Sequence, residues 1–143
     1  IVKDSVFEGV FAGGDILKGT VKMPGLDYEG EFKNFEASGE GKGIFEYEDG
    51  TTAIYQGQWL EEEPEGTGGY EYPNGTLYSG QVESGKFHGQ GTFFSPDGSS
   101  LRASWVEGVY QKGATLTLAN KKTTKAQSKI DQWLRNLPDD LFE

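Results

Sequence analysis

The stretch that decides the fold covers residues 78–100 and reads YSGQVESGKFHGQGTFFSPDGSS. In its first part, Tyr78, Gly80 and Val82 alternate with polar residues, and side chains two apart along a strand share a face. A second alternating run follows the glycines Gly89 and Gly91 and ends in Asp97-Gly98. Asp-Gly between alternating runs is a strong β-hairpin signal, because both residues tolerate positive φ. The stretch therefore predicts two antiparallel strands joined by tight turns.

The same pattern recurs along the chain, which is typical of a repeat architecture. Its starts are Phe7, Tyr28, Tyr55, Tyr78 and Leu101, which lie 21, 27, 23 and 23 residues apart. The predicted repeats cover residues 7–27, 28–54, 55–77, 78–100 and 101–121.

Three of these copies depart from the pattern, and the first is two residues short. In the second copy we take Gly41-Lys42-Gly43 as the glycine pair, and we place its four extra residues in the hairpin loop and after Gly50. The fifth copy lacks the glycine pair, and we expect it to lack the closing turn as well.

Together these features resemble the MORN repeat, whose pattern is Tyr-x-Gly-x-Trp, then His-Gly-x-Gly, then Asp-Gly. Residues 78–100 carry it most fully, with His88 before the glycine pair. The resemblance implies an all-β fold: a single-layer twisted antiparallel sheet of stacked hairpins, a β-solenoid, over residues 1–121. It also implies a scaffold that assembles with itself or holds a partner helix.

The apolar side chains of successive repeats should form columns on one face. The first strands supply Phe7, Tyr28, Tyr55, Tyr78 and Leu101, and beside them Phe11, Phe32, Trp59, Val82 and Trp105. The second strands supply Val21, Phe45, Tyr70, Phe93 and Leu116, and beside them Met23, Tyr47, Tyr72 and Leu118. A single sheet cannot cover such a face, and an exposed apolar strip usually marks an interaction site. The predicted partner-binding groove consists of Tyr28, Phe32, Phe45, Tyr47, Tyr55, Trp59, Tyr70, Tyr72 and Tyr78.

A different segment, residues 122–143, follows the repeats. Thr124 and Gln127 have the spacing of a capping box, with Thr as the cap and Gln three residues on. The apolar face of the predicted helix consists of Ala126, Ile130, Trp133, Leu134 and Leu137. Pro138 should end the helix. Residues 1–120 carry 8 basic and 19 acidic groups, whereas residues 121–143 carry 5 and 4. We therefore expect residues 124–137 to pack on the aromatic face of the last repeats, although the helix could instead project to a partner.

Several function classes are disfavoured by the sequence. A net charge of −10 opposes a nucleic-acid surface. His88 is the one histidine and cysteine is absent, so we expect no metal site, no cofactor and no catalytic centre. The acidic run at residues 61–65 lacks the spacing of a calcium loop.

The predicted function is a non-catalytic scaffold that binds a protein, either a helical peptide or another copy. One alternative is phospholipid association, which the resemblance implies and the charge opposes, since only Lys121, Lys122, Lys125 and Lys129 form a basic patch. Another is an accessory domain of a larger enzyme. The chain does not begin with Met, so we expect a fragment or a processed form. We expect a soluble protein of the cytoplasm or of an organelle stroma or matrix, and the partner, oligomeric state and compartment stay open.

Overall fold

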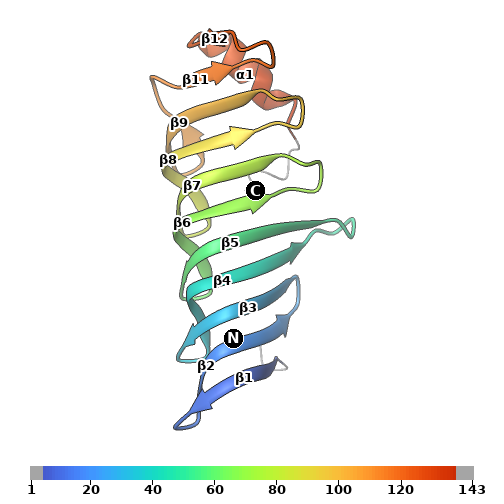
Figure 1. Ribbon diagram of the computed structural model, residues 1–143, viewed down its shortest axis with the longest axis vertical. Coiled ribbons are helices and arrows are strands. Elements are labelled where there is room, and N and C mark those ends of the chain that lie inside the picture. Colours follow the sequence, from blue (N-terminus) through green and yellow to red (C-terminus); the bar gives the residue numbers. More distant parts are fainter. Residues whose placement is uncertain (1–4, 138–143) are drawn as a thin grey trace.

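The computed structural model describes residues 5–137, which form one open antiparallel sheet followed by a helix. The strands are β1 (Val6–Ala12), β2 (Asp15–Met23), β3 (Leu26–Lys33), β4 (Glu36–Glu46), β5 (Thr52–Leu60), β6 (Glu63–Glu71), β7 (Leu77–Glu83), β8 (Lys86–Phe94), β9 (Ser100–Val106), β10 (Val109–Tyr110), β11 (Thr115–Thr117) and β12 (Thr123–Thr124), and the helix is α1 (Gln127–Arg135). The strands follow one another in chain order from β1 to β9 and continue with β11 and β12, while β10 pairs with β9. Figure 1 shows them stacked like rungs, with α1 at the β11 end. The predicted all-β class and single antiparallel sheet are confirmed.

Tight turns of one kind close the second strand of successive repeats. In the turn between β8 and β9, the Ser95 N–H donates to the Ser99 carbonyl (2.9 Å), and the Gly98 N–H donates to the Ser95 carbonyl (3.0 Å). The Asp97 carboxylate accepts hydrogen bonds from the hydroxyl and from the backbone N–H of Ser99. These bonds hold the pKa of the Asp97 carboxyl below its usual range, the hydroxyl contributing most. The Asp-Gly signal therefore acts through both backbone conformation and side-chain hydrogen bonding.

The fifth copy keeps this turn, so the expectation that it lacks one is wrong. Leu118 N–H donates to the Lys122 carbonyl (2.8 Å), and Lys121 N–H donates back to the Leu118 carbonyl (2.8 Å). Asn120 Oδ1 accepts from the Lys122 N–H (3.0 Å) in the manner of Asp97. Lys121 takes the glycine position with φ of 73°, a conformation in which a lysine is strained.

A line of glycines crosses the sheet, and we call it the glycine lane. Each member lies opposite the next on the neighbouring strand: Gly9, Gly19, Gly30, Gly41, Gly57, Gly68, Gly80 and Gly91. A Cβ on Gly30 would lie 2.5 Å from the Gly41 Cα, so a side chain does not fit there. The strand register shifts directly beside the lane, for example between Gly80 and Val82. Such bulges bend a strand and increase its twist.

The lane corrects the alignment of the second copy. Because Gly41 is the lane residue of β4, the glycine pair of this copy is Gly39-Glu40-Gly41 and not Gly41-Lys42-Gly43. Gly43 then lies opposite Tyr55, at the position that Tyr70 takes in the next copy. The ring of Trp59 fills the space, since a Cβ on Gly43 would lie 2.6 Å from the Trp59 ring. Phe45 is therefore not the equivalent of Tyr70, although the sequence alignment placed the two residues in one column.

The four extra residues of the second copy lengthen two strands. β4 has 11 residues where β6 and β8 have 9. Its partner β5 has 9 where β7 has 7. The predicted insertion in the hairpin loop is wrong, because two of the residues lie within β4 instead. The β4–β5 turn consequently projects beyond the neighbouring turns on that side of the sheet (Figure 1).

The helix begins later than the capping box predicts. α1 starts at Gln127 with Ala126 as N-cap residue and no side-chain cap. Thr124 lies in β12, where it pairs with Leu116, and its hydroxyl accepts a hydrogen bond from the Ala126 N–H (3.1 Å). The predicted capping box is wrong because pairing with the sheet holds Thr124 in an extended conformation. The helix ends at Arg135 with Asn136 as C-cap residue, and Pro138 lies outside the described residues.

Candidate binding site on the aromatic face

Three tyrosines hold equivalent positions in successive repeats and are at most 2% exposed: Tyr28, Tyr55 and Tyr78. Tyr55 illustrates the arrangement. Its hydroxyl donates to the Gln58 carbonyl (2.9 Å), and its ring lies across the lane, where a Cβ on Gly68 would be 2.2 Å from the hydroxyl oxygen. Burial raises the pKa of Tyr55 to about 12. These tyrosines fill the space that the glycines leave, so their main role is to build the sheet.

Ring contacts run without interruption along the aromatic face from β1 to β10. Successive centroids lie between 4.7 Å and 6.3 Å apart in the order Phe7, Phe32, Tyr28, Trp59, Tyr55, Tyr70, Phe87, Phe93, Trp105 and Tyr110. Most of these pairs meet edge to face, a geometry worth about 0.5–1.5 kcal/mol per pair beyond area burial. The face is thus a continuous apolar layer.

The nine residues of the predicted groove fall into two groups by exposure. Six are at most 7% exposed: Tyr28, Phe32, Tyr55, Trp59, Tyr72 and Tyr78. Three are half-buried: Phe45, Tyr47 and Tyr70. The half-buried rings have surface left for a partner, whereas the buried ones mainly contribute framework.

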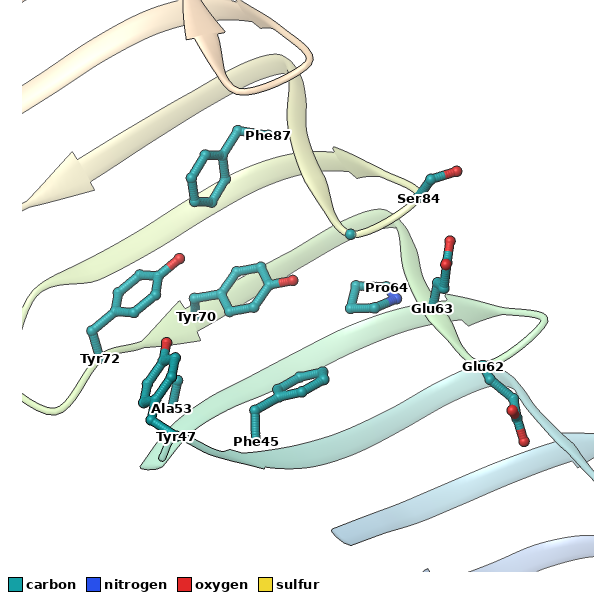
Figure 2. A pocket seen from close by; sticks show the side chains of 11 residues that line it. Phe45, Tyr47, Ala53, Glu62, Glu63, Pro64, Tyr70, Tyr72, Ser84 and Phe87 are labelled. Atoms are coloured by element: carbon teal, nitrogen blue, oxygen red, sulfur yellow. The ribbon is translucent and has the colours of Figure 1, made fainter. Parts of the chain in front are cut away.

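A pocket of about 280 Å³ lies at the half-buried group (Figure 2). Its walls include Phe45 and Tyr47 from the extended β4–β5 hairpin, and Tyr70 and Tyr72 from β6 and the turn after it. The Tyr70 and Tyr72 rings stack with centroids 5.6 Å apart and planes 12° apart. Burial raises the pKa of both hydroxyls, so both stay neutral at ordinary pH. A cavity of this size holds one or two apolar side chains.

The rim of the pocket carries carboxylates. Glu62 and Glu63 line it at the β5–β6 turn, beside the buried Pro64. They belong to the acidic run at residues 61–65. Figure 2 shows both carboxylates at one end, away from the tyrosine rings. An apolar floor with a negatively charged rim favours a ligand that is apolar in the middle and basic at its flank.

Next along the same face, α1 packs on the last repeats. Ile130 is 1% exposed and Leu137 is 8% exposed, and both belong to the hydrophobic core. Trp133 Nε1 donates to the Ser99 hydroxyl oxygen (2.8 Å), and the Tyr110 hydroxyl donates to Asp131 Oδ1 (2.5 Å). Hydrophobic burial and two side-chain hydrogen bonds therefore hold the helix on the sheet.

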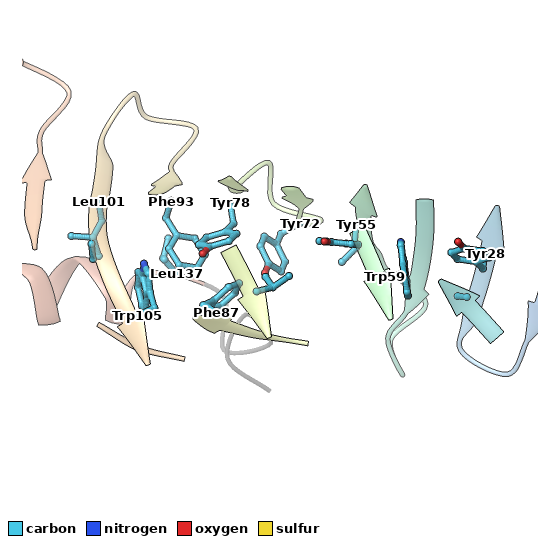
Figure 3. Close-up of a cluster of buried hydrophobic side chains, with 14 of the residues drawn as sticks. Tyr28, Tyr55, Trp59, Tyr72, Tyr78, Phe87, Phe93, Leu101, Trp105 and Leu137 are labelled. Carbon is cyan, nitrogen blue, oxygen red and sulfur yellow. The ribbon is translucent and has the colours of Figure 1, made fainter. Parts of the chain in front are cut away.

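The predicted apolar face of the helix needs one correction. Ile130, Trp133, Leu134 and Leu137 all contact the core. Figure 3 shows Leu137 beside Trp105 and the other rings of this layer. Ala126 does not belong to the packed face, because it is the exposed N-cap residue and lies before the first turn.

One column of apolar residues was missing from the sequence interpretation. Pro64, Phe87 and Tyr110 are spaced by the repeat period of 23 residues. Pro64 and Phe87 line the pocket, and Tyr110 contacts α1. The period alone could have identified them, but each stands directly after a hairpin loop, where no alternating pattern has begun.

His88 links two loops. Its Nε2 lies 3.2 Å from a Glu83 carboxylate oxygen, and its Nδ1 accepts from the Glu107 N–H (3.3 Å). Within residues 5–137, no group of three or more His, Cys, Asp or Glu side chains is arranged to hold a metal ion. These contacts fit a structural role at the hairpin loops.

Comparisons with known proteins agree with the repeats seen in the fold. The family model of the MORN repeat matches residues 40–52, 55–77 and 78–100. No curated protein matches the chain. In the described part of the chain, no helix combines the length and the apolar character that crossing a membrane requires.

Proposed function

Because this chain is a MORN-repeat protein, we propose that it is a non-catalytic protein-binding module whose aromatic pocket receives an amphipathic helix of a partner. MORN repeats are repeats that bind proteins or membranes and are generally not enzymes. The partner would place apolar side chains on Phe45, Tyr47 and Tyr70, the half-buried rings of the pocket.

The observation that carries the proposal is the packing of α1. An amphipathic helix already lies on this aromatic face, and it buries Ile130 almost completely. The face continues from there through Phe87 to the pocket, with Phe87 in ring contact with both Trp105 and Tyr70. A second helix in the pocket would meet the same kind of surface, with rings below and backbone turns at the side.

The negative charge at the rim of the pocket indicates which residues the partner should carry. The rim carboxylates at Glu62 and Glu63 favour basic residues beside the apolar anchors. The C-terminal segment has the same character, since Lys125 precedes α1 and the exposed Lys129 and Arg135 lie within it. The expected partner is therefore a basic amphipathic helix.

The test measures binding of defined peptides to the whole chain. We expect a fluorescent basic amphipathic peptide with apolar residues at i, i+4, i+7 and i+8 to bind, and a scrambled peptide of equal composition not to bind. Tyr70→Ala should weaken binding about tenfold or more, because an anchor ring in a pocket typically contributes over 1 kcal/mol. Leu77→Ala is the matched control, since Leu77 is 44% exposed and adjoins β6 on the opposite face.

Anisotropy titrations give the affinities, and urea denaturation shows whether each variant is folded. Equal binding of the ordered and scrambled peptides would contradict the proposal. So would a folded Tyr70→Ala chain with unchanged affinity.

The basic patch gives little support to the alternative function, membrane binding. Lys125 Nζ already hydrogen-bonds the Thr115 hydroxyl oxygen (2.7 Å). The four lysines of the patch, which include Lys125, reach only the lower limit of the four to eight clustered cations typical of recognition of anionic lipids, and the sheet that they accompany is strongly acidic. Co-sedimentation with anionic vesicles distinguishes the two functions.

A further inference from the structure

Aromatic rings from three consecutive hairpins line the pocket on the aromatic face (Figure 2). They belong to Phe45, Tyr47, Tyr70, Tyr72 and Phe87. Phe45 and Tyr47 are two residues apart and share a face, and so do Tyr70 and Tyr72. The Phe87 ring meets the Tyr70 ring edge to face, with centroids 6.0 Å apart. The walls of this pocket are thus mainly π surface.

The paired rings are specific to this part of the array. Tyr47 and Tyr72 begin equivalent turns, since the N–H of each donates to the carbonyl of the residue four positions on (both 2.9 Å). Ser95 begins the next turn with the same hydrogen bond, and serine has no ring. The repeat fold therefore does not require an aromatic residue at this position, and the cluster of rings points to a role beyond framework.

Carboxylates stand at one end of these rings. Glu62 and Glu63 line the pocket at the β5–β6 turn, and Glu63 is exposed. Among the residues that the structure describes, neither Lys nor Arg lines this pocket. The chain as a whole carries a net charge of −10. The potential at the mouth of the pocket is therefore negative and attracts cations.

Aromatic walls favour one kind of cation over the others. The face of an aromatic ring attracts a cation that lies within about 6 Å of its centroid. An ordinary lysine ammonium carries three N–H donors, which lose their water on entering such a pocket and find weak acceptors in the ring faces. A trimethylammonium group has no N–H donor, so it leaves water at a lower cost. Its bulk is close to that of a leucine side chain, which the volume of about 280 Å³ accommodates.

We infer that the pocket is an aromatic cage for a quaternary ammonium group, which a trimethylated lysine of the partner helix supplies. The inference rests on the proposed function, because it names the residue that anchors the basic flank of the partner. Phosphocholine lipids carry the same cationic group, but their phosphate would come close to the carboxylates of Glu62 and Glu63 without a lining Lys or Arg to pair with it. A methylated lysine brings no such anion.

The first test compares three forms of the basic amphipathic peptide on the whole chain. One lysine beside the apolar anchors is unmodified, trimethylated, or replaced by the neutral isostere that has carbon in place of the ammonium nitrogen. Isothermal titration calorimetry should give an affinity about tenfold higher for the trimethylated form than for either of the others. Equal affinities of the trimethylated and neutral forms would mean that apolar contact alone holds the side chain, and they overturn the inference. A trimethylated form that binds no more tightly than the unmodified one overturns it as well.

A ring substitution tests whether π surface provides the preference. Phe45→Leu keeps apolar bulk and removes the ring, so the preference for the trimethylated over the neutral form should fall about threefold. A general loss of packing would weaken both forms alike, which makes the ratio of affinities the readout. Phe94→Leu is the matched control, since Phe94 is 44% exposed and alternates with the buried Phe93, so it lies on the opposite face. An unchanged ratio in Phe45→Leu overturns the inference.

A charge substitution tests the rim in the same way. Glu63→Gln should lower the preference for the trimethylated over the neutral form, because it removes a carboxylate that lines the pocket. Glu107→Gln makes the same change at an exposed turn residue outside the pocket lining and should leave the preference as it is. An equal effect of the two variants would mean that only the net charge matters, and it overturns the assignment of the rim.

Two further probes separate this inference from the proposed function. Tetramethylammonium chloride should shift the aromatic NMR signals of the wild-type pocket, and its neutral isostere neopentanol should not do so equally. If tetramethylammonium binds but no peptide does, the helix proposal fails and the cage stands. If the ordered peptide binds regardless of methylation, the cage fails and the helix proposal stands, and if neither probe binds, both fail. Co-sedimentation with pure phosphatidylcholine vesicles that trimethyllysine peptide does not exceed in affinity would overturn the assignment to a partner lysine.

Discussion

We expect Gly68→Ala to lower the stability of this protein more than Gly69→Ala does at the neighbouring position. Neither glycine has a positive φ, so backbone strain does not distinguish them. A Cβ on Gly68 would lie 2.2 Å from the Tyr55 hydroxyl oxygen and 2.5 Å from a ring carbon. A Cβ on Gly69 would meet one atom, the Tyr78 carbonyl oxygen at 3.2 Å, which needs a shift of a few tenths of an ångström.

The magnitude follows from what Tyr55 loses. Its side chain is 0% exposed, and displacing the ring overpacks the layer at a cost of about 1–3 kcal/mol. The hydrogen bond from its hydroxyl to the Gln58 carbonyl contributes about 1 kcal/mol more. Both alanine variants gain about 0.4–1 kcal/mol through the unfolded chain, and this gain cancels in the comparison. Gly68→Ala should therefore be about 2–4 kcal/mol less stable than Gly69→Ala.

Urea denaturation monitored by tryptophan fluorescence measures the difference, since the chain has three tryptophans. With a slope of about 2 kcal/mol/M, the midpoints of the two variants should lie about 1–2 M apart. In a Tyr55→Leu background, the penalty of Gly68→Ala should largely vanish, because the clashing ring is gone. Equal midpoints for the two single variants would refute the idea that the glycine lane leaves the space that the tyrosine rings fill. An undiminished penalty of Gly68→Ala in the Tyr55→Leu background would refute it as well.

Three other predictions follow from the packing, the turn and the titration of the tyrosines. Tyrosine in the unfolded chain loses its proton near pH 10, whereas burial raises the pKa of Tyr55 in the folded chain to about 12. The contribution of Tyr55 to stability is therefore full below about pH 10 and is lost as the pH rises toward 12. Urea midpoints measured at about pH 9, 10.5 and 11.5 should decrease in that order. Ile130→Ala removes about 2–4 kcal/mol of core packing, so hydrogen exchange of the α1 amides should speed up, whereas exposed Lys129→Ala should not change it. Lys121→Gly relieves a φ of 73° and should stabilise the chain by up to about 1 kcal/mol in thermal denaturation followed by circular dichroism, and no gain is expected for Lys122→Gly.

The repeat fold could be predicted from the sequence because the signals that carry it are local. Asp97-Gly98 sets a turn within four residues, and alternation sets which side chains share a face. The 23-residue period then places equivalent residues on neighbouring hairpins. One sheet with one aromatic face follows from these local rules, and so does a C-terminal amphipathic helix with Ile130 and Trp133 on its packed side.

Other features depend on contacts between distant residues, and only the tertiary structure decided them. The second copy aligned wrongly because its glycine pair is identified by the strand opposite, where Gly41 meets Gly57. Thr124 satisfies the local rule for a helix cap, but pairing with Leu116 draws it into the sheet. The division of the aromatic residues into buried framework and half-buried surface likewise depends on which ring covers which. Tyr55 and Tyr70 look alike in the sequence, and their neighbours across the sheet make one of them core and the other the wall of a pocket.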